Sequence, residues 1–568
     1  MTEAGAPVRV GNCSGFYGDR PAAMREMLTG GELDYLTGDY LAELTMLILG
    51  RDRARDPERG FARTFLRQLE ECLGLAADAG VRIVTNAGGL NPAGLAAAVR
   101  SLAGQLGVPV TVAHVEGDDL LPRAAEFGFG TPLTANAYLG AWGIVECLDA
   151  GADIVVTGRV TDASLAVGAA AAHFGWQRTD HDRTAGAIAA GHVIECGAQA
   201  TGGNYAFFTE IADMLRPGFP IAEIHADGSS VITKHPGTGG AVTVDTVTAQ
   251  LLYEIGGARY ANPDATLRLD SIRLSADGPD RVRLHGVRGE PPPPTLKVGL
   301  NSLGGFRNEM TFVLTGLDID AKAALVREQL EAGLTRRPQE LQWTLARTDR
   351  PDADTEQTAS ALLRCVVRDQ DAAVVGRQFS STAVELALAS YPGFTTTAPP
   401  GDGQVYGVFS AAHVPNEQVP HVAVLPDGTR RDVTPASRTA ALEAVTTPPV
   451  VPFRSASPTR RVPLGLVAGA RSGDKGGSAN VGVWVRTEPQ WHWLATTLTI
   501  DLLRELLPET RDLPVTRHLL PELRAVNFVI DEILGAGVAY QARFDPQAKG
   551  LAEWLRSRYV DVPEELLP

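Results

Sequence analysis

Short apolar segments alternate with longer stretches of helical periodicity over the first 200 residues, and this alternation restricts the fold. The apolar segments are Val8–Asn12, Val81–Asn86, Val108–Val115 and Ala152–Gly158. The helical stretches are Phe61–Ala77, Pro92–Leu106 and Ala135–Ala150. Strands that are apolar throughout are buried on both faces, so the pattern predicts a mostly parallel, doubly wound sheet with helices on both faces. About five such units occur, fewer than the eight that a closed α/β barrel requires.

The pattern changes after residue 200. Leu267–Leu274 and Arg281–Val287 alternate polar and apolar residues across a Ser-Ala-Asp-Gly-Pro turn, which predicts an antiparallel hairpin. The remaining boundaries follow changes of composition. We expect an α/β part at 1–290, an α+β part at 291–445, a Pro-rich linker at 446–463 and a further domain at 464–568.

The composition excludes several classes of function. A net charge of −16 argues against a nucleic-acid partner, because phosphate backbones bind concentrated basic surfaces. The five cysteines are widely spaced without a CxxC pair, so neither a disulfide framework nor a zinc or iron–sulfur site is expected. We predict a cytoplasmic protein with no membrane partner, no metal and no cofactor, since signal-peptide, membrane-span and nucleotide-loop patterns are missing from the sequence.

Three polar, glycine-containing loops follow predicted parallel strands, and the carboxyl ends of such strands are where open α/β sheets bind ligands. We therefore expect the loops to converge on one cleft. Either Asp162 acts as a base or it caps the helix that follows it, and any one loop can equally be a tight turn. The candidate binding residues are Asn12, Ser14 and Gly15 in the first loop, Asn86, Gly88 and Gly89 in the second, and Arg159, beside Asp162, in the third.

Two further segments combine polar residues with glycine. In the segment 191–204, His192, Glu195 and Cys196 would share one helix face, and a buried Glu195 would suit proton transfer. The segment ends at Asn204, a candidate for binding. Lys234 precedes a glycine turn and a predicted helix, which suits an anionic ligand or a plain surface turn equally well.

The segment 470–480 carries the densest mixture of charge and glycine. We predict strands at Leu464–Ala470 and Val481–Arg486, with an irregular loop between them that docks on the N-terminal part. Lys475 is one of only five lysines in the chain. The alternative is a solvated surface connection. The candidate anion-binding residues here are Arg471, Lys475, Ser478 and Asn480.

Six segments together resemble the acyclic terpene utilisation (AtuA-like) family. They are GNCSGFYGDR (11–20), TNAGGLNP (85–92), VTGRVTDASL (156–165), GHVIECGAQATGGNY (191–205), KHPGTGGAVT (234–243) and ARSGDKGGSANVGV (470–483). The resemblance implies an AtuA-like domain at 1–445 and a ferredoxin-like α+β sandwich at 464–568. It also implies a place in bacterial breakdown of branched acyclic isoprenoids, which proceeds through coenzyme A thioesters.

We therefore expect an enzyme of branched acyl-CoA metabolism, a lyase or hydratase acting next to the thioester, that works as a homo-oligomer. Such chemistry needs a proton-transferring carboxyl group, backbone donors for an enolate oxygen and basic groups for the coenzyme A phosphates. We expect Arg159, Arg471 and Lys475 to hold a phosphate or a carboxylate. Asp162, Glu195 and Lys475 are the candidate catalytic residues, and coenzyme A enters as part of the substrate. The alternative is a non-catalytic protein that organises the acyl-CoA enzymes of the same pathway.

Overall fold

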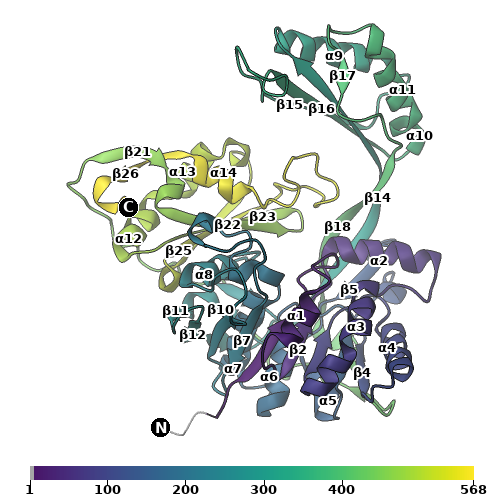
Figure 1. Ribbon diagram of the computed structural model, residues 1–568, viewed down its shortest axis with the longest axis vertical. Coiled ribbons are helices and arrows are strands. Elements are labelled where there is room, and N and C mark those ends of the chain that lie inside the picture. Colours follow the sequence, from purple (N-terminus) through teal and green to yellow (C-terminus); the bar gives the residue numbers. More distant parts are fainter. Residues whose placement is uncertain (1–4) are drawn as a thin grey trace. The chain divides into compact units, whose positions relative to one another are not determined.

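The computed structural model describes residues 5–568, which divide into two compact units (Figure 1). The first unit holds the described residues up to Asn301, together with Phe409–Val538 and Asp545–Pro568. The second unit holds Ser302–Val408 and Ala539–Phe544. The candidate functional site lies entirely in the first unit.

Five parallel strands form the centre of an 11-stranded sheet in the first unit. Their order is β1 (Val8–Asn12), β2 (Tyr35–Gly38), β3 (Arg82–Thr85), β6 (Ile154–Thr157) and β4 (Val112–Glu116). The predicted α/β class with a parallel sheet is confirmed. The strand β2 was not predicted, because it spans only four residues.

Antiparallel strands extend the parallel centre at both edges. β7 (Pro220–Ile224), β8 (Ser230–Lys234), β12 (Val282–His285) and β11 (Arg273–Ala276) follow β1, while β19 (Val422–Val424) and β20 (Arg430–Asp432) follow β4. The predicted hairpin is confirmed as β11 and β12. Its first strand starts later than predicted, because Leu267 lies in β10 (Thr266–Arg268) of a separate three-stranded sheet with β9 (Arg259–Ala261) and β13 (Arg288–Glu290).

Helices cover both faces of the central sheet, as predicted (Figure 1). Along β6, Ile154 and Val156 join a core with α1 (Ala23–Thr29), α3 (Arg63–Ala79) and α4 (Pro92–Leu106). Val155 joins the opposite core with α5 (Trp142–Asp149), α6 (Ser164–Phe174) and α7 (His181–Ile194). The start of α4 is capped by Asn91, whose side chain accepts the amide of Gly94 at 2.9 Å.

The helix predicted at Ala135–Ala150 is wrong in its first part. Thr134–Ala137 forms β5, which pairs antiparallel with residues 298–301 of β14 (Thr295–Thr315), and α5 begins only at Trp142. The segment is rich in alanine and therefore favours a helix locally, but pairing with a strand distant in sequence overrides this propensity.

The second unit is an antiparallel sheet with helices on one face. In this unit β14 pairs with β16 (Ser360–Asp369), which pairs with β15 (Glu340–Ala346). The helices α9 (Ile319–Gly333) and α11 (Arg377–Glu385) close a core around Phe312 and Phe379. This arrangement accounts for the α+β pattern in that stretch of the sequence.

The C-terminal sheet is four-stranded and antiparallel, in the order β22 (Ala468–Lys475), β23 (Ser478–Val485), β25 (Ala525–Ile530) and β24 (Val515–Leu520). The residues predicted to form an irregular loop belong instead to a tight hairpin, because Lys475 pairs with Ser478 across Gly476 and Gly477. Gly476 has a φ of 66°, which glycine adopts without strain. Leu464–Leu466, predicted as strand, is a short 3-10 turn.

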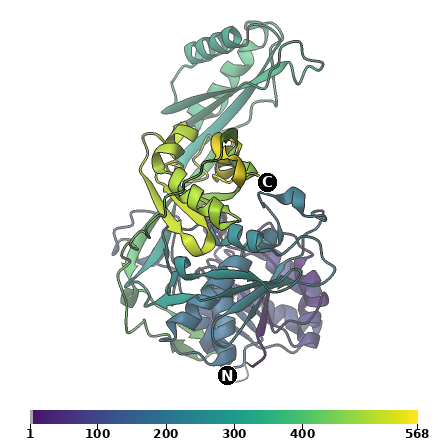
Figure 2. The same ribbon diagram turned by 90° about the vertical axis from the view of Figure 1, so that its left-hand side faces the viewer.

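Each face of this C-terminal sheet has its own cover. One face packs on α12 (Glu488–Thr497), α13 (Ile500–Leu506) and α14 (Leu551–Ser557), which explains the alternating apolar residues. The other face lies against α8 (Val244–Leu251) and the residues that follow it (Figure 2). Trp484 on that face is buried in the core of the N-terminal sheet. Among the described residues, no helix is long and apolar enough to span a bilayer.

Candidate functional site

Three carboxyl groups meet where the parallel strands of the first unit end. Asp39 follows β2, Asp162 lies in the loop after β6, and Glu195 ends α7. One oxygen of each lies within 4.8 Å of the others. Asp39 and Glu195 are buried, whereas the Asp162 side chain is 35% exposed. Ligands of open α/β sheets bind at this end of the strands, so the cluster lies at the expected place.

Neighbouring loops hold Asp39 in place. Its Oδ1 accepts a hydrogen bond from Asn86 Nδ2 at 2.6 Å and another from the amide of Leu41 at 3.1 Å. Asn86 in turn accepts the amide of Tyr40 through its own Oδ1, at 2.8 Å. Asn86 therefore orients a carboxyl group from the neighbouring strand, and both of its polar atoms are engaged by the protein.

Glu195 is fixed by the first loop and by its own helix. The Asn12 amide donates to the carbonyls of Ile194 and Glu195, at 2.8 and 3.0 Å. The Cys196 thiol donates to Glu195 Oε2 at 3.1 Å, and His192 Nδ1 lies 3.9 Å from Glu195 Oε1. The predicted grouping of His192, Glu195 and Cys196 is therefore present in the structure.

Arg159 lies beside the cluster as a buried cation. Its Nη1 forms an ion pair with Asp162 Oδ1 at 2.9 Å and contacts the carbonyl of Leu41 at 3.3 Å. The guanidinium also stacks on Tyr138, 4.1 Å from the ring centre. Its Nε is buried and has no hydrogen-bond partner among the described residues. An unused buried donor of this kind is suited to an oxygen atom of a ligand.

Burial raises the pKa of two of the three carboxyl groups. Burial, followed by the charge of Asp162, raises the pKa of Asp39 to about 8. Burial and the charges of Asp162 and Asp39 raise the pKa of Glu195 well above its ordinary value. Asp162 differs from both in its surroundings, because it is partly exposed and forms an ion pair with Arg159.

The C-terminal sheet contributes Lys475 to the same site. The Lys475 Nζ donates to the carbonyl of Glu254 at 3.0 Å and lies 5.9 Å from the centre of the Tyr260 ring. Tyr260 stacks on His192, with 5.2 Å between ring centres. Lys475 is open to solvent, yet desolvation by the surrounding protein and then the charge of Lys297 lower its pKa. Burial and the charge of Lys475 lower the pKa of His192 to about 4.

The docking of this sheet, which the sequence predicted, is built on close contacts. Asn480 donates to the carbonyl of Leu252 at 2.7 Å and accepts the amide of Glu254 at 2.9 Å. A side chain at Gly473 would collide with the Tyr253 ring, since an added Cβ would lie 2.4 Å from it. Arg471 stacks on Tyr253 at 4.2 Å and donates to Gln199.

The remaining predicted residues of the first two loops serve the loops themselves. The Ser14 hydroxyl donates to the carbonyl of Phe16, and the amide of Gly15 donates to Asp19 Oδ2 at 2.8 Å. An added Cβ at Gly15 would lie 2.4 Å from the amide nitrogen of Gly197, so only glycine fits. The amide of Gly89 donates to the carbonyl of Asn86, and an added Cβ at Gly88 would lie 2.4 Å from the carbonyl oxygen of Thr157.

Three other predicted residues are placed elsewhere. Asn204 is exposed in a turn with a φ of 57°. Lys234 is buried at the end of β8, where its Nζ donates to the carbonyl of Thr238 at 2.7 Å and pairs with Asp280 at 3.1 Å. Ser478 donates to Asp531 Oδ1 at 3.0 Å within the C-terminal sheet. We give none of these three a role in the proposed function.

The family comparison covers nearly all of this architecture. The model described as acyclic terpene utilisation family protein AtuA matches residues 8–425, and the AtuA ferredoxin-like domain matches residues 462–561. The chain belongs to the AtuA family. The resemblance seen in the sequence is thus confirmed, including the ferredoxin-like domain that carries Lys475 in this AtuA family member. No curated protein and no solved structure matches the chain.

Sequence reasoning missed several residues of this candidate site. Asp39 follows β2 in a Gly-Asp-Tyr sequence, and recognition of that four-residue strand would have pointed to it. Tyr138 and Lys297 lie beside the distant pairing of β5 with β14, and Glu43 begins the helix α2 (Glu43–Arg55). The Lys297 Nζ lies 4.7 Å from the centre of the Tyr138 ring and 3.7 Å from Glu43 Oε1. For Lys297 the signal was the scarcity of lysine.

The same carboxyl groups have the ligand type that hard divalent cations prefer. Among the described residues, Asp39, Asp162 and Glu195 are the group of acidic, cysteine or histidine side chains that could hold a metal ion. No cofactor-binding motif accompanies them in the sequence. Burial raises the pKa of Asp39 and Glu195, and both would have to lose their protons before they could coordinate a cation.

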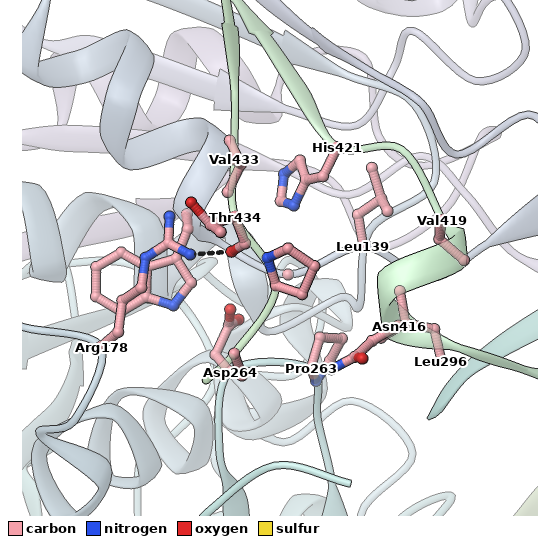
Figure 3. A pocket seen from close by; sticks show the side chains of 14 residues that line it. Leu139, Arg178, Pro263, Asp264, Leu296, Asn416, Val419, His421, Val433 and Thr434 are labelled. Atoms are coloured by element: carbon pink, nitrogen blue, oxygen red, sulfur yellow. Dashed lines mark hydrogen bonds between the residues drawn. The ribbon is translucent and has the colours of Figure 1, made fainter. Parts of the chain in front are cut away.

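A separate cavity of about 50 Å³ lies in the first unit, lined by Leu139, Arg178, Asp264 and His421 among others (Figure 3). Burial raises the pKa of Asp264 to about 6, and its carboxylate accepts the amide of Ala141 at 2.8 Å. Figure 3 shows the Arg178 guanidinium directed at Thr434, whose carbonyl it contacts. None of the three clustered carboxyl groups lines this cavity.

Proposed function

We propose that this AtuA family member is an enzyme of branched or isoprenoid acyl-CoA metabolism, a lyase or hydratase that acts next to the thioester. The observation that carries the proposal is the cluster of Asp39, Asp162 and Glu195, in which two buried carboxyl groups of raised pKa lie beside a third that pairs with a buried arginine. Family membership supplies the link to acyclic terpene utilisation.

In the direction of hydration, the Asp162 carboxylate takes a proton from water as the oxygen bonds to the β-carbon of an unsaturated acyl group. The electron pair of the double bond moves onto the thioester oxygen, which Arg159 stabilises through its unused Nε–H. Glu195 then delivers its proton to the α-carbon, and the reverse order eliminates water. Retro-aldol cleavage would use the same base on a β-hydroxyl group and the same acid on the leaving enolate.

A purely organising protein would have no use for these groups. Buried carboxyl groups close together cost stability, because each one disfavours the ionisation of its neighbours. Such a cluster is expected where a reaction needs an acid and a base side by side.

The direct test follows the α-proton. The purified chain is incubated in D₂O with branched saturated, unsaturated and 3-hydroxy acyl-CoA thioesters, and the products are read by mass spectrometry. We expect incorporation of one deuteron at the α-carbon, with gain or loss of water or C–C cleavage for the matching substrate. Wild-type protein that exchanges no α-proton on any of these thioesters would contradict the proposal.

A further inference from the structure

Two lysines from distant parts of the sequence face one space beside the carboxyl cluster. Lys297 lies on β14 and Lys475 at the end of β22. The Phe409 ring links them: it lies 5.5 Å from Lys297 Nζ and 3.3 Å from the position of a Cβ added at Gly476. The charge of Lys297 is also the second largest cause of the lowered pKa of Lys475. The two ammonium groups are therefore neighbours that repel each other.

Neither ammonium group donates a hydrogen bond to a carboxylate of the described residues, although Lys297 forms an ion pair with Glu43. The Lys297 Nζ lies 3.7 Å from Glu43 Oε1, which is too long for a hydrogen bond, and otherwise faces the Tyr138 ring. Among the described residues, Lys475 has a hydrogen bond only to the Glu254 carbonyl, so two of its three N–H groups remain available. Two adjacent cations with unused donors are suited to an anion placed between them.

The surroundings favour a singly charged anion. The negative charges of Glu43 and Asp162 act on Lys475, and they would repel a doubly charged phosphate more strongly than a carboxylate. Phosphate sites also rely on clustered backbone amides, but those of Gly15 and Gly89 are engaged inside their own loops.

We infer that Lys297 and Lys475 form a clamp for a carboxylate group of the substrate. The substrate class is then an acyl thioester with a carboxylate at the far end of its acyl chain, and the clamp sets the acyl group against the carboxyl cluster. This inference rests on the proposed function, because it names the substrate class of the same site.

The scarcity of lysine provides a direct experiment. Biosynthetic labelling with ¹³C at the lysine Cε leaves every ammonium N–H intact and gives signals for only five lysines. Spectra of the full chain are recorded during titration with glutarate, with its uncharged analogue glutaramide and with inorganic phosphate, all at constant ionic strength. Lys297→Gln and Lys475→Gln variants assign their signals. Lys322, which donates to Thr315 in the second unit, is the internal control.

We expect glutarate to shift the signals of Lys297 and Lys475 with one shared dissociation constant, while the Lys322 signal and the glutaramide titration stay unchanged. Removing either lysine should weaken glutarate binding by about tenfold, as expected for loss of one charge-assisted contact. If only phosphate shifts the two lysine signals, the lysines bind a phosphate group and the carboxylate clamp is wrong. If neither anion shifts them, the clamp is overturned.

The two proposals fail separately. If wild-type protein exchanges the α-proton of a thioester in D₂O but glutarate moves neither lysine signal, the clamp is wrong and the proposed reaction stands. If glutarate moves both signals and no thioester undergoes exchange, the clamp stands and the reaction class is wrong.

Discussion

Two lysines beside glycine turns look alike in the sequence and differ completely in the structure. Lys234 precedes His-Pro-Gly-Thr-Gly-Gly, and Lys475 precedes Gly-Gly. The Lys234 ammonium is buried, hydrogen-bonded to Thr238 and ion-paired with Asp280, and it closes its own loop. The Lys475 ammonium has a single carbonyl partner among the described residues and lies among the titratable groups of the carboxyl site. A cation with satisfied partners supports the fold, whereas one with unused donors is available to a ligand.

The largest expected effect tests whether Glu195, which belongs to the same site as Lys475, transfers a proton in the reaction. Glu195→Gln removes a proton donor at nearly constant volume, so turnover should fall by about 10²–10⁴-fold while the melting temperature changes little. Turnover is measured by the α-proton exchange assay, and unfolding by scanning calorimetry.

The matched control is Glu223→Gln. Glu223 is also a buried glutamate, but its partners are Arg9 and Arg281 at the antiparallel edge of the sheet. This variant should lose stability and keep its turnover per folded molecule. Equal turnover in Glu195→Gln and the wild type would make Glu195 a structural residue.

Exchanging the two lysines for methionine should separate their roles. Lys475→Met should lower kcat/KM by about 10–100-fold, mainly through a higher KM, and leave the free energy of unfolding within about 0.5 kcal/mol. Lys234→Met should do the reverse and cost about 1–3 kcal/mol, because Asp280 and the Thr238 carbonyl lose their partner. Urea unfolding and steady-state kinetics measure the two quantities, and the comparison fails if both variants lose mainly stability.

The carboxyl cluster should reduce stability at alkaline pH. The pKa of Asp39 is raised to about 8 in the folded state, so the unfolded state binds fewer protons between about pH 4 and pH 8, and stability falls as pH rises through this window. Asp39→Asn removes this dependence. We expect the variant to be more stable than the wild type at pH 8, by about 1–3 kcal/mol, and nearly equal to it at pH 4.

Urea unfolding at both pH values, in a buffer with chelator, measures the difference. Asp245→Asn is the control, since Asp245 lies outside the cluster and pairs with Arg486. If Asp39→Asn and the wild type show the same pH dependence, the Asp39 carboxyl is not held protonated by its surroundings.

The smallest expected effect concerns Asn204. The sequence predicted it as a binding residue because it ends a glycine-rich segment. Its exposed, left-handed conformation predicts that Asn204→Gly changes stability by a few tenths of a kcal/mol and turnover by less than about twofold. A loss of binding for a thioester substrate in this variant would return Asn204 to the site.

The central fold could be predicted because its signals are local. Val8–Asn12 and Pro92–Leu106 have the bounds that their apolar periodicity, Asn91 cap and closing glycine indicate. The strand β5 was wrongly predicted as helix, because Thr134–Ala137 owes its extended conformation to pairing with residues more than 150 positions later in the chain. Local patterns contain no information on such a partner.

Part of the site was also predictable, because some of its residues stand in recognisable local sequence contexts. Asp162, Glu195 and Lys475 stand in polar, glycine-rich contexts that differ from ordinary packing, and the structure brings them into one region. Asn12 and Asn86 were found by the same signal, but they orient backbone and carboxyl groups. Sequence context locates polar residues near a site. It does not show whether their hydrogen bonds are directed at the protein or at a ligand.

The docking of Trp484 and Asn480 has a consequence for the order of biosynthesis. A ribosome completes Asp39, Asp162 and Glu195 long before it reaches Lys475, so the nascent N-terminal part holds its acid and base without the cation of the C-terminal sheet. The carboxyl cluster therefore meets the Lys475 cation only after the later strands have been made and seated. Assembly of the site requires synthesis past residue 530, where the last strand of the C-terminal sheet ends.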